Sequence, residues 1–296
     1  MKCLVTGSSG LIGSQLTFDL EQLGYTVYSC YNNSEPQYGI PIKFDLLNST
    51  SVSKTLQKLH PDIIIHLAAM TDVEKCELEP TLAYSINAQA TELIAKESNN
   101  LDCFLIYLST DYVFDGKIGL YDENDLTNPL NQYGKSKLAG EKAIENYNSN
   151  WSILRTSTPF GIHPQNKTFP VWVVENILKN KKLNIVKDQF TSPTYVPNLS
   201  KMVINILSQN LEGLFHLSGS TRISRYDFAK KIIDELNLNS SLLYPTTLDS
   251  MPWKSKRPSD SSFDISKANS FLTSKPASIE NSLDDFIPKL VNSFSL

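Results

Sequence analysis

The sequence predicts an α/β protein in which a doubly wound parallel sheet is joined to a smaller, irregular α/β part. Up to about residue 155, short apolar runs alternate with amphipathic segments, as in sheets whose parallel strands are connected by helices. The runs at 62–66 and 103–108 are apolar almost throughout, which is typical of central strands covered on both faces. Beyond about residue 156 the alternation breaks, which indicates the second part.

The first strand and the turn after it open the fold. The apolar run Cys3–Val5 leads into three glycines, and apolar residues then recur every three or four positions, as in an amphipathic helix. Gly7 suits a tight turn, Gly10 lets the backbone approach a phosphate, and Gly13 allows the helix to pack closely on the strand. Free N–H groups at the start of a helix attract anions. The turn therefore predicts a dinucleotide-binding site of the Rossmann type.

The remaining elements follow in chain order. Strands are expected at 26–31, at a short run ending near 45, and at 62–66, 103–108, 151–155, 183–186 and 214–217. Helices are expected at 51–59, 80–98, 129–147, 169–179, 199–208, 225–236 and 279–294. The Ser/Pro-rich stretch 239–262 is either a linker or an ordered loop. We expect an NAD(P)-binding Rossmann domain and a substrate-binding domain, made of 1–156 plus about 190–222 and of about 157–189 plus 223–296.

Composition limits the classes of function. The 296 residues carry a net charge of −4, which argues against a nucleic-acid binder because that class needs a basic face. Four cysteines without C-x-x-C spacing and four histidines without metal-binding spacing predict buried thiols in a reducing compartment and no metal site. Apolar runs fall short of the ~18 residues of a membrane span, and the first is too short for a signal peptide. We therefore expect a cytoplasmic protein with no membrane partner.

The predicted topology places one site at the carboxyl ends of the strands. In a sheet of order 3-2-1-4-5-6, ligands bind where the order reverses between strands one and four. The segments after strands one, four and five meet there. They carry the glycine turn, the small residues at 67–71, and the sequence Ser109-Thr110-Asp111. Small residues let a flat ring or a ribose lie close to the backbone.

A tyrosine and a lysine occupy the helix after strand five, which is expected to begin at Asn128-Pro129. Tyr133 and Lys137 are four residues apart and share one helix face. An ammonium beside a phenol stabilises the phenolate, so we expect Lys137 to lower the tyrosine pKa from ~10 and to make Tyr133 a general acid or base. Tyr226 and Lys230 have the same spacing, but their helix does not follow strand five, so we expect an ordinary surface helix there.

Longer strings connect the chain to a known family. The sequence at 109–116 reads STDYVFDG and the sequence at 133–141 reads YGKSKLAGE, with further agreement at 6–13, 68–77, 188–194 and 257–258. In these strings the chain resembles the extended short-chain dehydrogenase/reductase family, and within it most resembles the dTDP-4-dehydrorhamnose reductases. The resemblance covers nearly the whole chain.

The resemblance implies hydride transfer from a nicotinamide ring to the 4-keto group of a deoxysugar nucleotide. Tyr133 would protonate the developing alkoxide, Lys137 would hold the nicotinamide ribose, and Thr110 would hydrogen-bond the reacting oxygen. The cofactor would contact Gly7, Ser9, Gly10, Leu11, Ile12, Gly13, Cys30, Asp45, Leu46, Ala68, Ala69, Met70, Thr71, Tyr133 and Lys137. The substrate would contact Thr110, Asp111, Thr158 and Arg257. For Arg257, which lies in a basic cluster, a solvated loop is the alternative.

Two departures from the family pattern matter. Thr158 follows Arg155-Thr156-Ser157 where the reductases often carry Trp, so the identity of the sugar stays open. Strand two ends at Cys30-Tyr31-Asn32 without the acid that binds the ribose 2′-hydroxyl of NAD. NADP(H) is therefore favoured as the cofactor, with NAD(H) left open. The expected partner is a nucleotide sugar, and a homodimer is left open.

Three other functions compete with simple reduction. A sugar-nucleotide dehydratase typically has Asp-Glu after the threonine of strand five, whereas Asp111 is followed by Tyr112, which favours reduction. A sugar-nucleotide epimerase uses the same Thr, Tyr and Lys and stays open. The regulatory subunit of methionine adenosyltransferase resembles the same reductases and can retain the Tyr and Lys. A catalytically weak binding subunit therefore stays open as well.

Overall fold

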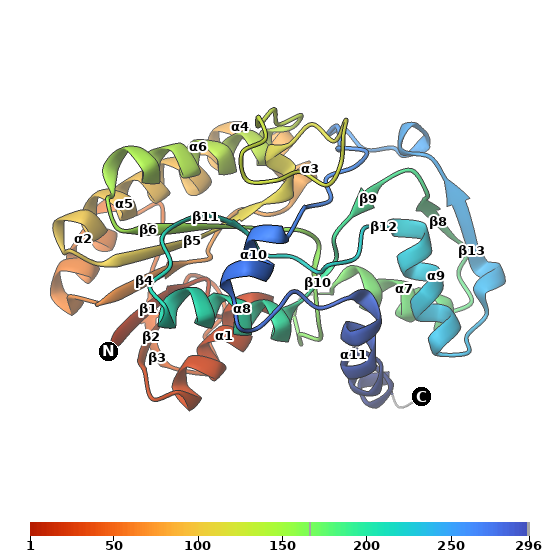
Figure 1. The fold of residues 1–296 in the computed structure, drawn as a ribbon, viewed down its shortest axis with the longest axis horizontal. Helices are drawn as coiled ribbons and strands as arrows, with labels where there is room; N and C mark the ends of the chain where they lie inside the picture. The colour runs from red at the N-terminus through yellow and green to blue at the C-terminus, as the bar shows by residue number, and fades with distance from the viewer. Residues whose placement is uncertain (166, 295–296) are drawn as a thin grey trace.

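Seven parallel strands form one sheet in the larger part of the molecule (Figure 1). The computed structural model describes residues 1–165 and 167–294. The strand order is β11-β6-β5-β4-β1-β2-β3, which confirms the predicted doubly wound fold. The strands of this sheet are β1 (Lys2–Thr6), β2 (Thr26–Tyr31), β3 (Ile40–Lys43), β4 (Ile63–His66), β5 (Phe104–Thr110), β6 (Trp151–Thr156) and β11 (Gly213–His216).

Helices cover both faces of this sheet, and β4 shows why its residues are almost all apolar. Ile63 and Ile65 pack into one hydrophobic cluster and Ile64 into another, because successive side chains of a strand point to opposite faces. Each fully buried isoleucine or leucine contributes about 1.5–3 kcal/mol. One face is covered by α1 (Leu11–Gln22), α8 (Val196–Ser208) and α10 (Ser266–Phe271), and the other by α2 (Ser49–Leu59), α5 (Ala90–Asn100) and α6 (Gln132–Tyr147).

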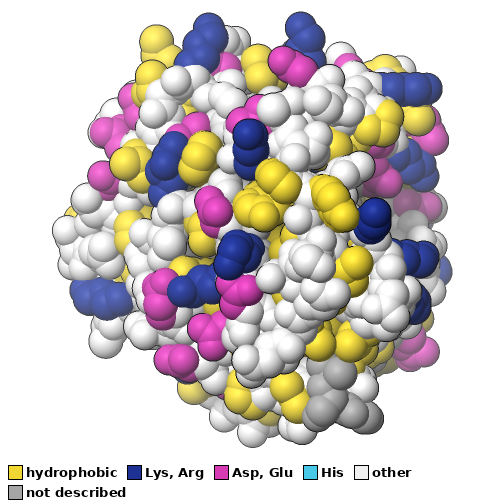
Figure 2. All heavy atoms as spheres, turned by 90° about the vertical axis from the view of Figure 1, so that its right-hand side faces the viewer, with side chains coloured by type: hydrophobic (Ala, Val, Ile, Leu, Met, Phe, Trp, Pro, Cys, Tyr) yellow, Lys and Arg dark blue, Asp and Glu magenta, His cyan; other side chains and the backbone are white. Residues whose placement is uncertain are grey.

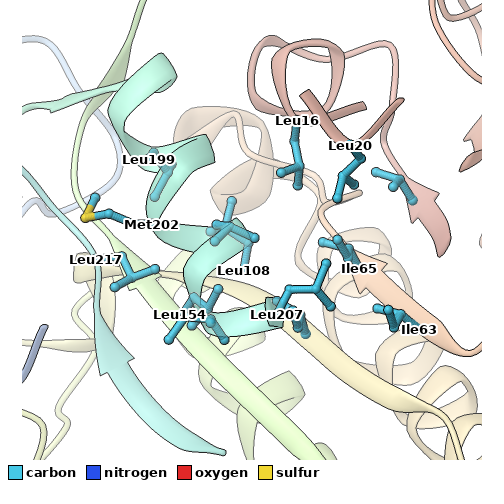
Figure 3. Close-up of a cluster of buried hydrophobic side chains, with 14 of the residues drawn as sticks. Leu16, Leu20, Ile63, Ile65, Leu108, Leu154, Leu199, Met202, Leu207 and Leu217 are labelled. Atoms are coloured by element: carbon cyan, nitrogen blue, oxygen red, sulfur yellow. The ribbon is translucent and has the colours of Figure 1, made fainter. Parts of the chain in front are cut away.

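Figure 3 shows the first of these clusters. Leu16 and Leu20 of α1 and Leu199 and Met202 of α8 are completely buried. They lie over the strands on the face to which Ile65 points. Residues of α8, in the second half of the sequence, therefore pack against strands formed by the first half.

The connection from β4 to β5 is more complex than the single helix that the sequence predicts at 80–98. It contains α3 (Val73–Leu78), α4 (Pro80–Tyr84), a π-helical turn at Ser85–Gln89, and then α5. Asn87 lies on the π-helical turn and is 1% exposed. Such turns frequently occur at functional sites, because they shift one side chain out of the regular helical pattern.

The smaller part of the molecule lies beside the sheet, to the right in Figure 1. Phe160 is completely buried at its centre, with its ring centroid 5.2 Å from that of Phe228 and 5.3 Å from that of Phe286. Its main elements are α7 (Phe169–Leu178), β8 (Leu183–Val186), α9 (Arg225–Glu235), β13 (Leu243–Thr246) and α11 (Ile279–Phe294). Its short elements are β7 (Pro159–Phe160), β9 (Phe190–Thr191), β10 (Thr194–Tyr195), β12 (Ile223–Ser224) and the 3₁₀ turns at Ser240–Leu242 and Leu248–Ser250.

The Ser/Pro-rich stretch is ordered, so the linker alternative is wrong. It contains β13, which pairs in parallel with β8. Residues 254–264, here called the crossing segment, then run between the two parts of the molecule. Tyr121 donates its backbone N–H to Ser262 at 2.9 Å, and Phe190 donates its own to Ser259 at 2.7 Å. The segment is therefore hydrogen-bonded to a loop of the larger part and to a strand of the smaller part.

Two further differences concern boundaries. α6 begins at Gln132 and not at Asn128-Pro129, because the Asn131 side chain accepts the backbone N–H of Gly134 and caps the helix there. The proposed division into domains stays a prediction. Ala268 of α10 packs into the hydrophobic cluster that contains Leu16 and Leu199, on one face of the sheet. The predicted boundary instead assigns residues 223–296 to the substrate-binding domain.

The surface of the smaller part carries charges of both signs. In Figure 2, lysine and arginine side chains are interspersed with acidic ones over this face. None of the helices in the described residues is long and apolar enough to cross a membrane. Within residues 1–165 and 167–294, no cluster of three or more His, Cys, Asp or Glu side chains could hold a metal ion.

Candidate active site

A cavity of about 890 Å³ opens at the carboxyl ends of the strands and extends to the smaller part of the molecule. All the residues assigned above to cofactor, substrate or chemistry contribute to its lining. The glycine turn, the end of β2 and the loop after β4 line one end. Residues from the smaller part, among them Thr158 and Arg225, line the other. The volume is within the usual range for ligand pockets.

The glycine turn leaves the first N–H groups of α1 open to this cavity. Gly7 has a φ of +68°, which favours glycine, and a Cβ on Gly13 would lie 2.2 Å from the Gly7 carbonyl oxygen. Gly10 is the N-cap residue, so no side chain caps the helix, and the first turn contains no acidic residue. An uncapped helix start with a positive dipole end fits a diphosphate.

Buried hydrogen bonds hold the loop after β4. The Thr6 hydroxyl oxygen accepts two consecutive backbone N–H groups of this loop, each at 3.1 Å, so its single proton goes to Nδ1 of His66 at 2.7 Å. His66 therefore carries its proton on Nε2 and donates it to Thr91 at 3.1 Å. Burial lowers the pKa of His66 to about 3, which keeps the ring neutral. His66 thus acts as a structural link beneath the cavity.

Asn87 positions the cavity wall, and the sequence pattern did not reveal it. Its side-chain oxygen accepts the backbone N–H of Met70 at 2.8 Å, and its amide donates to the Met70 carbonyl at 3.0 Å and to Ser136 at 2.9 Å. The contacts join α6 to the loop after β4. They depend on the π-helical turn, which has no clear signature in a 3.6-residue periodicity.

Tyr133, Thr110 and Lys137 meet where β5 ends beside α6. Tyr133 and Thr110 both line the cavity here, and the Tyr133 ring packs edge-on against that of Tyr112 with ring centroids 5.9 Å apart. The Lys137 ammonium donates to the carbonyl of Leu108 at 2.7 Å and lies 4.0 Å from the centre of the Tyr107 ring. Lys137 is only 2% exposed, whereas Tyr133 is partly exposed at the cavity wall.

The expected effect of Lys137 on Tyr133 is wrong for this structure. Desolvation of the hydroxyl by surrounding protein atoms raises the pKa of Tyr133, and the charge of Asp111 raises it further. The Thr110 hydrogen bond lowers it but does not offset these effects. Burial also lowers the pKa of Lys137 to about 7, and its ammonium is directed at Leu108. Tyr133 is therefore protonated at neutral pH.

Asp111 has partners within the protein for both of its side-chain oxygens. Thr110 donates to Oδ1 at 3.1 Å, and Ser157 and Ser261 donate to Oδ2 at 2.9 and 2.5 Å. Burial raises the pKa of Asp111, while these three hydroxyls and the charge of Arg225 lower it. Its assignment to substrate binding stays a prediction, since these hydroxyls already surround the carboxylate.

Two arginines line the outer end of the cavity. The Arg257 guanidinium lies 3.8 Å from the centre of the Trp253 ring and 3.6 Å from Glu74, so it is not in a solvated loop. Its Nε is buried and has no hydrogen-bond partner within the described part of the chain. Arg225 donates to Gln189 at 3.0 Å. Sequence reasoning missed Arg225, because only the fold brings the start of α9 to this cavity.

The second Tyr-x-x-x-Lys pair lies elsewhere, as expected. Tyr226 packs against the hydrophobic cluster of the smaller part, and Lys230 is exposed and forms an ion pair with Asp234 one turn further along α9. Neither residue lines the cavity.

Comparison with known proteins extends this picture. Residues 1–292 match the family model described as the RmlD substrate binding domain. The chain is 30% identical over 288 residues to a probable low-salt glycan biosynthesis reductase of Haloferax volcanii, with 96% of each chain covered. It is 32% identical over 274 residues to the methionine adenosyltransferase 2 subunit beta of Xenopus tropicalis, covering 90% of this chain and 81% of that one.

Solved structures of reductases superpose on nearly the whole chain. A dTDP-4-dehydrorhamnose reductase from Bacillus anthracis in complex with NADP is 32% identical, with a TM-score of 0.88, covering 97% of this chain and 99% of that one. A hypothetical dTDP-4-dehydrorhamnose reductase from Sulfolobus tokodaii is 36% identical, with a TM-score of 0.86, covering 94% and 97%. With its sheet, its glycine turn and its match over residues 1–292, this chain belongs to the RmlD substrate-binding domain family.

Proposed function

We propose that this protein is an NAD(P)H-dependent reductase that acts on the 4-keto group of a deoxysugar nucleotide, with Tyr133 as general acid. One observation carries the proposal. Tyr133, Thr110 and Lys137 line the same cavity as the uncapped glycine turn, so a proton donor lies within one site with a diphosphate-binding helix start. The likeness to dTDP-4-dehydrorhamnose reductases supports the reaction class.

The lining of the cavity fits a nicotinamide dinucleotide, which supplies a hydride when bound. The glycine turn would hold the diphosphate, and Cys30, Asp45 and Leu46 would contact the adenine end. The small residues from Ala68 to Thr71 leave room for a flat ring and its ribose. The Lys137 ammonium donates one of its three protons to the Leu108 carbonyl. It can donate the other two to ribose hydroxyls.

We further propose that NADP(H) is preferred over NAD(H). No acidic residue follows β2 at Cys30-Tyr31-Asn32, so a 2′-phosphate meets no like charge there. Lys43 donates to the Asn32 carbonyl and lies 5.4 Å from the centre of the Tyr31 ring, which provides a cation at this end of the cavity. Titration of the protein with each cofactor tests the preference. Tighter binding of NADH than of NADPH, unaffected by Lys43→Met, would contradict it.

The proton chemistry suits the reductive direction. A phenol that stays protonated at neutral pH can donate its proton to an oxygen that gains negative charge as the hydride arrives. Thr110 lies beside it, and Arg225 and Arg257 would hold the phosphates of the nucleotide sugar through charge-assisted hydrogen bonds. Thr158 also lines the cavity and would contact the sugar, in place of the Trp that the family's reductases often carry.

Oxidation of NADPH and NADH in the presence of dTDP-4-keto-6-deoxy-mannose tests the proposal. We expect the wild type to turn over and Tyr133→Phe to lose about 10²–10⁴-fold in kcat. Tyr226→Phe is the matched control, since that residue has the same spacing to a lysine but lies outside the cavity. Equal losses in both variants, or none in Tyr133→Phe, would contradict the role of Tyr133.

The resemblance to the methionine adenosyltransferase 2 subunit beta supports a second candidate, a regulatory subunit. A purified chain that binds cofactor, never oxidises it with any 4-keto nucleotide sugar, and co-purifies with another enzyme in fixed ratio would establish this candidate. An epimerase would instead retain its dinucleotide through purification. We also propose a cytoplasmic location, because Cys3, Cys30, Cys76 and Cys103 are free and buried, as in a reducing compartment.

A further inference from the structure

One carboxylate of the larger part holds the start of the crossing segment. Glu74 lies on α3, and its side-chain oxygens accept the backbone N–H groups of Lys254 at 2.9 Å and of Ser255 at 3.3 Å. The Ser255 hydroxyl donates to the same carboxylate. These partners lie 180 and 181 positions further along the chain. A single side chain therefore fixes two consecutive residues of the crossing segment.

Further contacts with the larger part continue along the segment. The Asn131 side chain donates to the Lys256 carbonyl at 2.8 Å. Beyond Arg257, the Ser259 hydroxyl donates to the Gly116 carbonyl at 2.7 Å. Residues on both sides of Arg257 are therefore anchored to the larger part. Because the backbone is held in this way, the groups around the Arg257 side chain decide the direction in which it points.

The Arg257 guanidinium is oriented by two side chains that leave its N–H groups free for a ligand. It stacks on the Trp253 ring, 3.8 Å from the ring centre, which uses the face of the guanidinium and not its N–H edge. Its Nη2 lies 3.6 Å from Glu74, which is longer than a hydrogen bond. Within residues 1–165 and 167–294, its buried Nε has no hydrogen-bond partner. Since Arg257 lines the cavity, these groups can donate to a ligand there.

We propose that Glu74 is a positioning residue that holds Arg257 toward the diphosphate of the bound nucleotide sugar. The inference rests on the proposed function, which makes Arg257 a phosphate ligand, and deepens it. Val73 and Lys75 line the cavity but Glu74 does not, so Glu74 acts through the crossing segment. Its side chain is 32% exposed and its ion pair with Arg257 is long, so the pair itself contributes little. A closer, bidentate pair would occupy the N–H edge that the phosphates need.

The charges of this region agree with an anionic ligand. Lys254, Lys256 and Arg257 place three cations within four residues, and Lys75 also lines the cavity. Glu74 offsets one of these charges while it holds the stretch in place. A glutamine at position 74 keeps the length of the side chain but loses the charge and one of the two acceptor oxygens. We therefore expect it to hold the segment less firmly and Arg257 with it.

Calorimetric titration with dTDP and with UDP tests the proposal without any turnover. The protein is first saturated with NADP⁺, so that the added nucleotide reports on the other end of the cavity. We expect Glu74→Gln to weaken binding of the nucleoside diphosphate about tenfold, and to leave the affinity for NADP⁺ within about twofold of the wild type. Glu77→Gln is the matched control. It removes the same charge from the same helix, but Glu77 accepts the backbone N–H of Gln132 at 3.0 Å.

A double-variant cycle separates positioning from a general structural effect. Arg257→Met should weaken binding of the nucleoside diphosphate about tenfold or more. In that background Glu74→Gln should cause no further loss, because the residue through which it acts is absent. An equal loss in both backgrounds, equal losses in the Glu74 and Glu77 variants, or wild-type affinity in Glu74→Gln overturns the proposal. So does wild-type affinity in Arg257→Met, a result that needs no Glu74 variant.

The outcome is independent of the reductase assay. A chain that binds dTDP or UDP with this dependence on Glu74, but never oxidises NADPH, upholds the positioning role and contradicts only the proposed reduction. A chain that turns over, with the same nucleotide affinity in wild type and Glu74→Gln, contradicts only the positioning role. A wild type that binds neither dTDP nor UDP also overturns the positioning role.

Discussion

Two helices of this chain carry a tyrosine and a lysine four residues apart, and they differ in their surroundings. On α6, Tyr133 and Lys137 line the cavity, and the lysine is 2% exposed. On α9, Lys230 is exposed and paired with Asp234, while Tyr226 packs into the hydrophobic cluster of the smaller part. Spacing places two side chains on one face of a helix. The element that the helix follows decides whether that face meets strand ends or solvent.

The two helices also differ in how closely they pack against neighbouring elements. A Cβ on Gly134 would lie 2.1 Å from the Tyr112 carbonyl oxygen, and one on Gly140 would lie 2.5 Å from the Tyr107 hydroxyl. These glycines let α6 approach β5 and the 3₁₀ turn Asp111–Val113, whereas α9 contains no glycine.

Lys137→Met should cause the largest difference between the helices. We expect it to lower kcat/KM for NADPH oxidation by about 10²-fold or more, because under the proposed function Lys137 binds the nicotinamide ribose next to Tyr133. Lys230→Met should remain close to the wild type, since its ammonium faces solvent. Steady-state kinetics of the two variants measures this. Equal losses would indicate a general effect of removing a lysine.

The same substitution should stabilise the protein near neutral pH. Burial lowers the pKa of Lys137 from 10.5 to about 7, so between these values the unfolded chain binds more protons than the folded one. The free energy of unfolding contributed by Lys137 is thus lowest below pH 7 and rises as the pH increases toward 10. Near pH 7, Lys137→Met should be more stable by about 3–5 kcal/mol, and this gain should shrink as the pH rises.

Denaturant unfolding of the wild type and of Lys137→Met from about pH 6 to pH 10 measures the difference, with Lys230→Met as control. A difference that does not change with pH would contradict the lowered pKa. A variant with more stability and less activity would show that a buried lysine is retained for function.

Gly140→Ala should destabilise the protein by about 1–3 kcal/mol, although alanine favours a helix more than glycine does. Its Cβ would collide with the Tyr107 hydroxyl and, at 2.6 Å, with the Asn87 carbonyl oxygen. Gly161→Ala is the control, because the nearest atom to its Cβ would be 3.5 Å away. Thermal unfolding of both variants decides the point. A neutral Gly140→Ala would mean that α6 can move away from β5.

Substitutions of the two N-cap residues should have the smallest effects on stability. Ser224 caps α9 by accepting the Asp227 N–H at 3.0 Å, and its removal should cost about 1 kcal/mol. Asn131 caps α6 and also donates to the Lys256 carbonyl at 2.8 Å. Asn131→Ala should therefore cost about 2 kcal/mol and raise KM for the nucleotide sugar, because Lys256 precedes Arg257. Equal effects of the two substitutions on KM would contradict this link.

Much of the sheet was predictable, because its signals are local. The apolar run Ile63–Ile65 and the periodic residues after Gly13 depend on burial on known faces, so the strands and the first helix were expected at the observed places. β13 was missed, because Tyr244 and Pro245 interrupt its apolar pattern, and it is held by pairing with the distant β8. The short α3 was missed for the same reason, since six residues give little periodicity.

The candidate site divides in the same way. The predicted strand order and the four-residue helix spacing were enough to place Thr110, Tyr133 and Lys137 in one site, because both signals come from residues close together in sequence. The partners of Asp111 were not predictable, because Ser261 is 150 residues away in sequence. The pKa of Tyr133 was predicted in the wrong direction. Spacing shows which charges are near, but desolvation depends on every atom packed around the hydroxyl.

The crossing segment fixes the order in which the site is completed during synthesis. Leu120 donates to Ser262 across 142 residues of sequence, so this contact forms only after the chain as far as Ser262 has emerged from the ribosome. The glycine turn, β4 and β5 emerge long before Arg257. The end of the cavity lined by the glycine turn therefore emerges before the end lined by Arg257. A nascent chain that stops short of Ser261 also leaves Asp111 without one of its donors, so this part of the site forms only after residues 254–264 have left the ribosome.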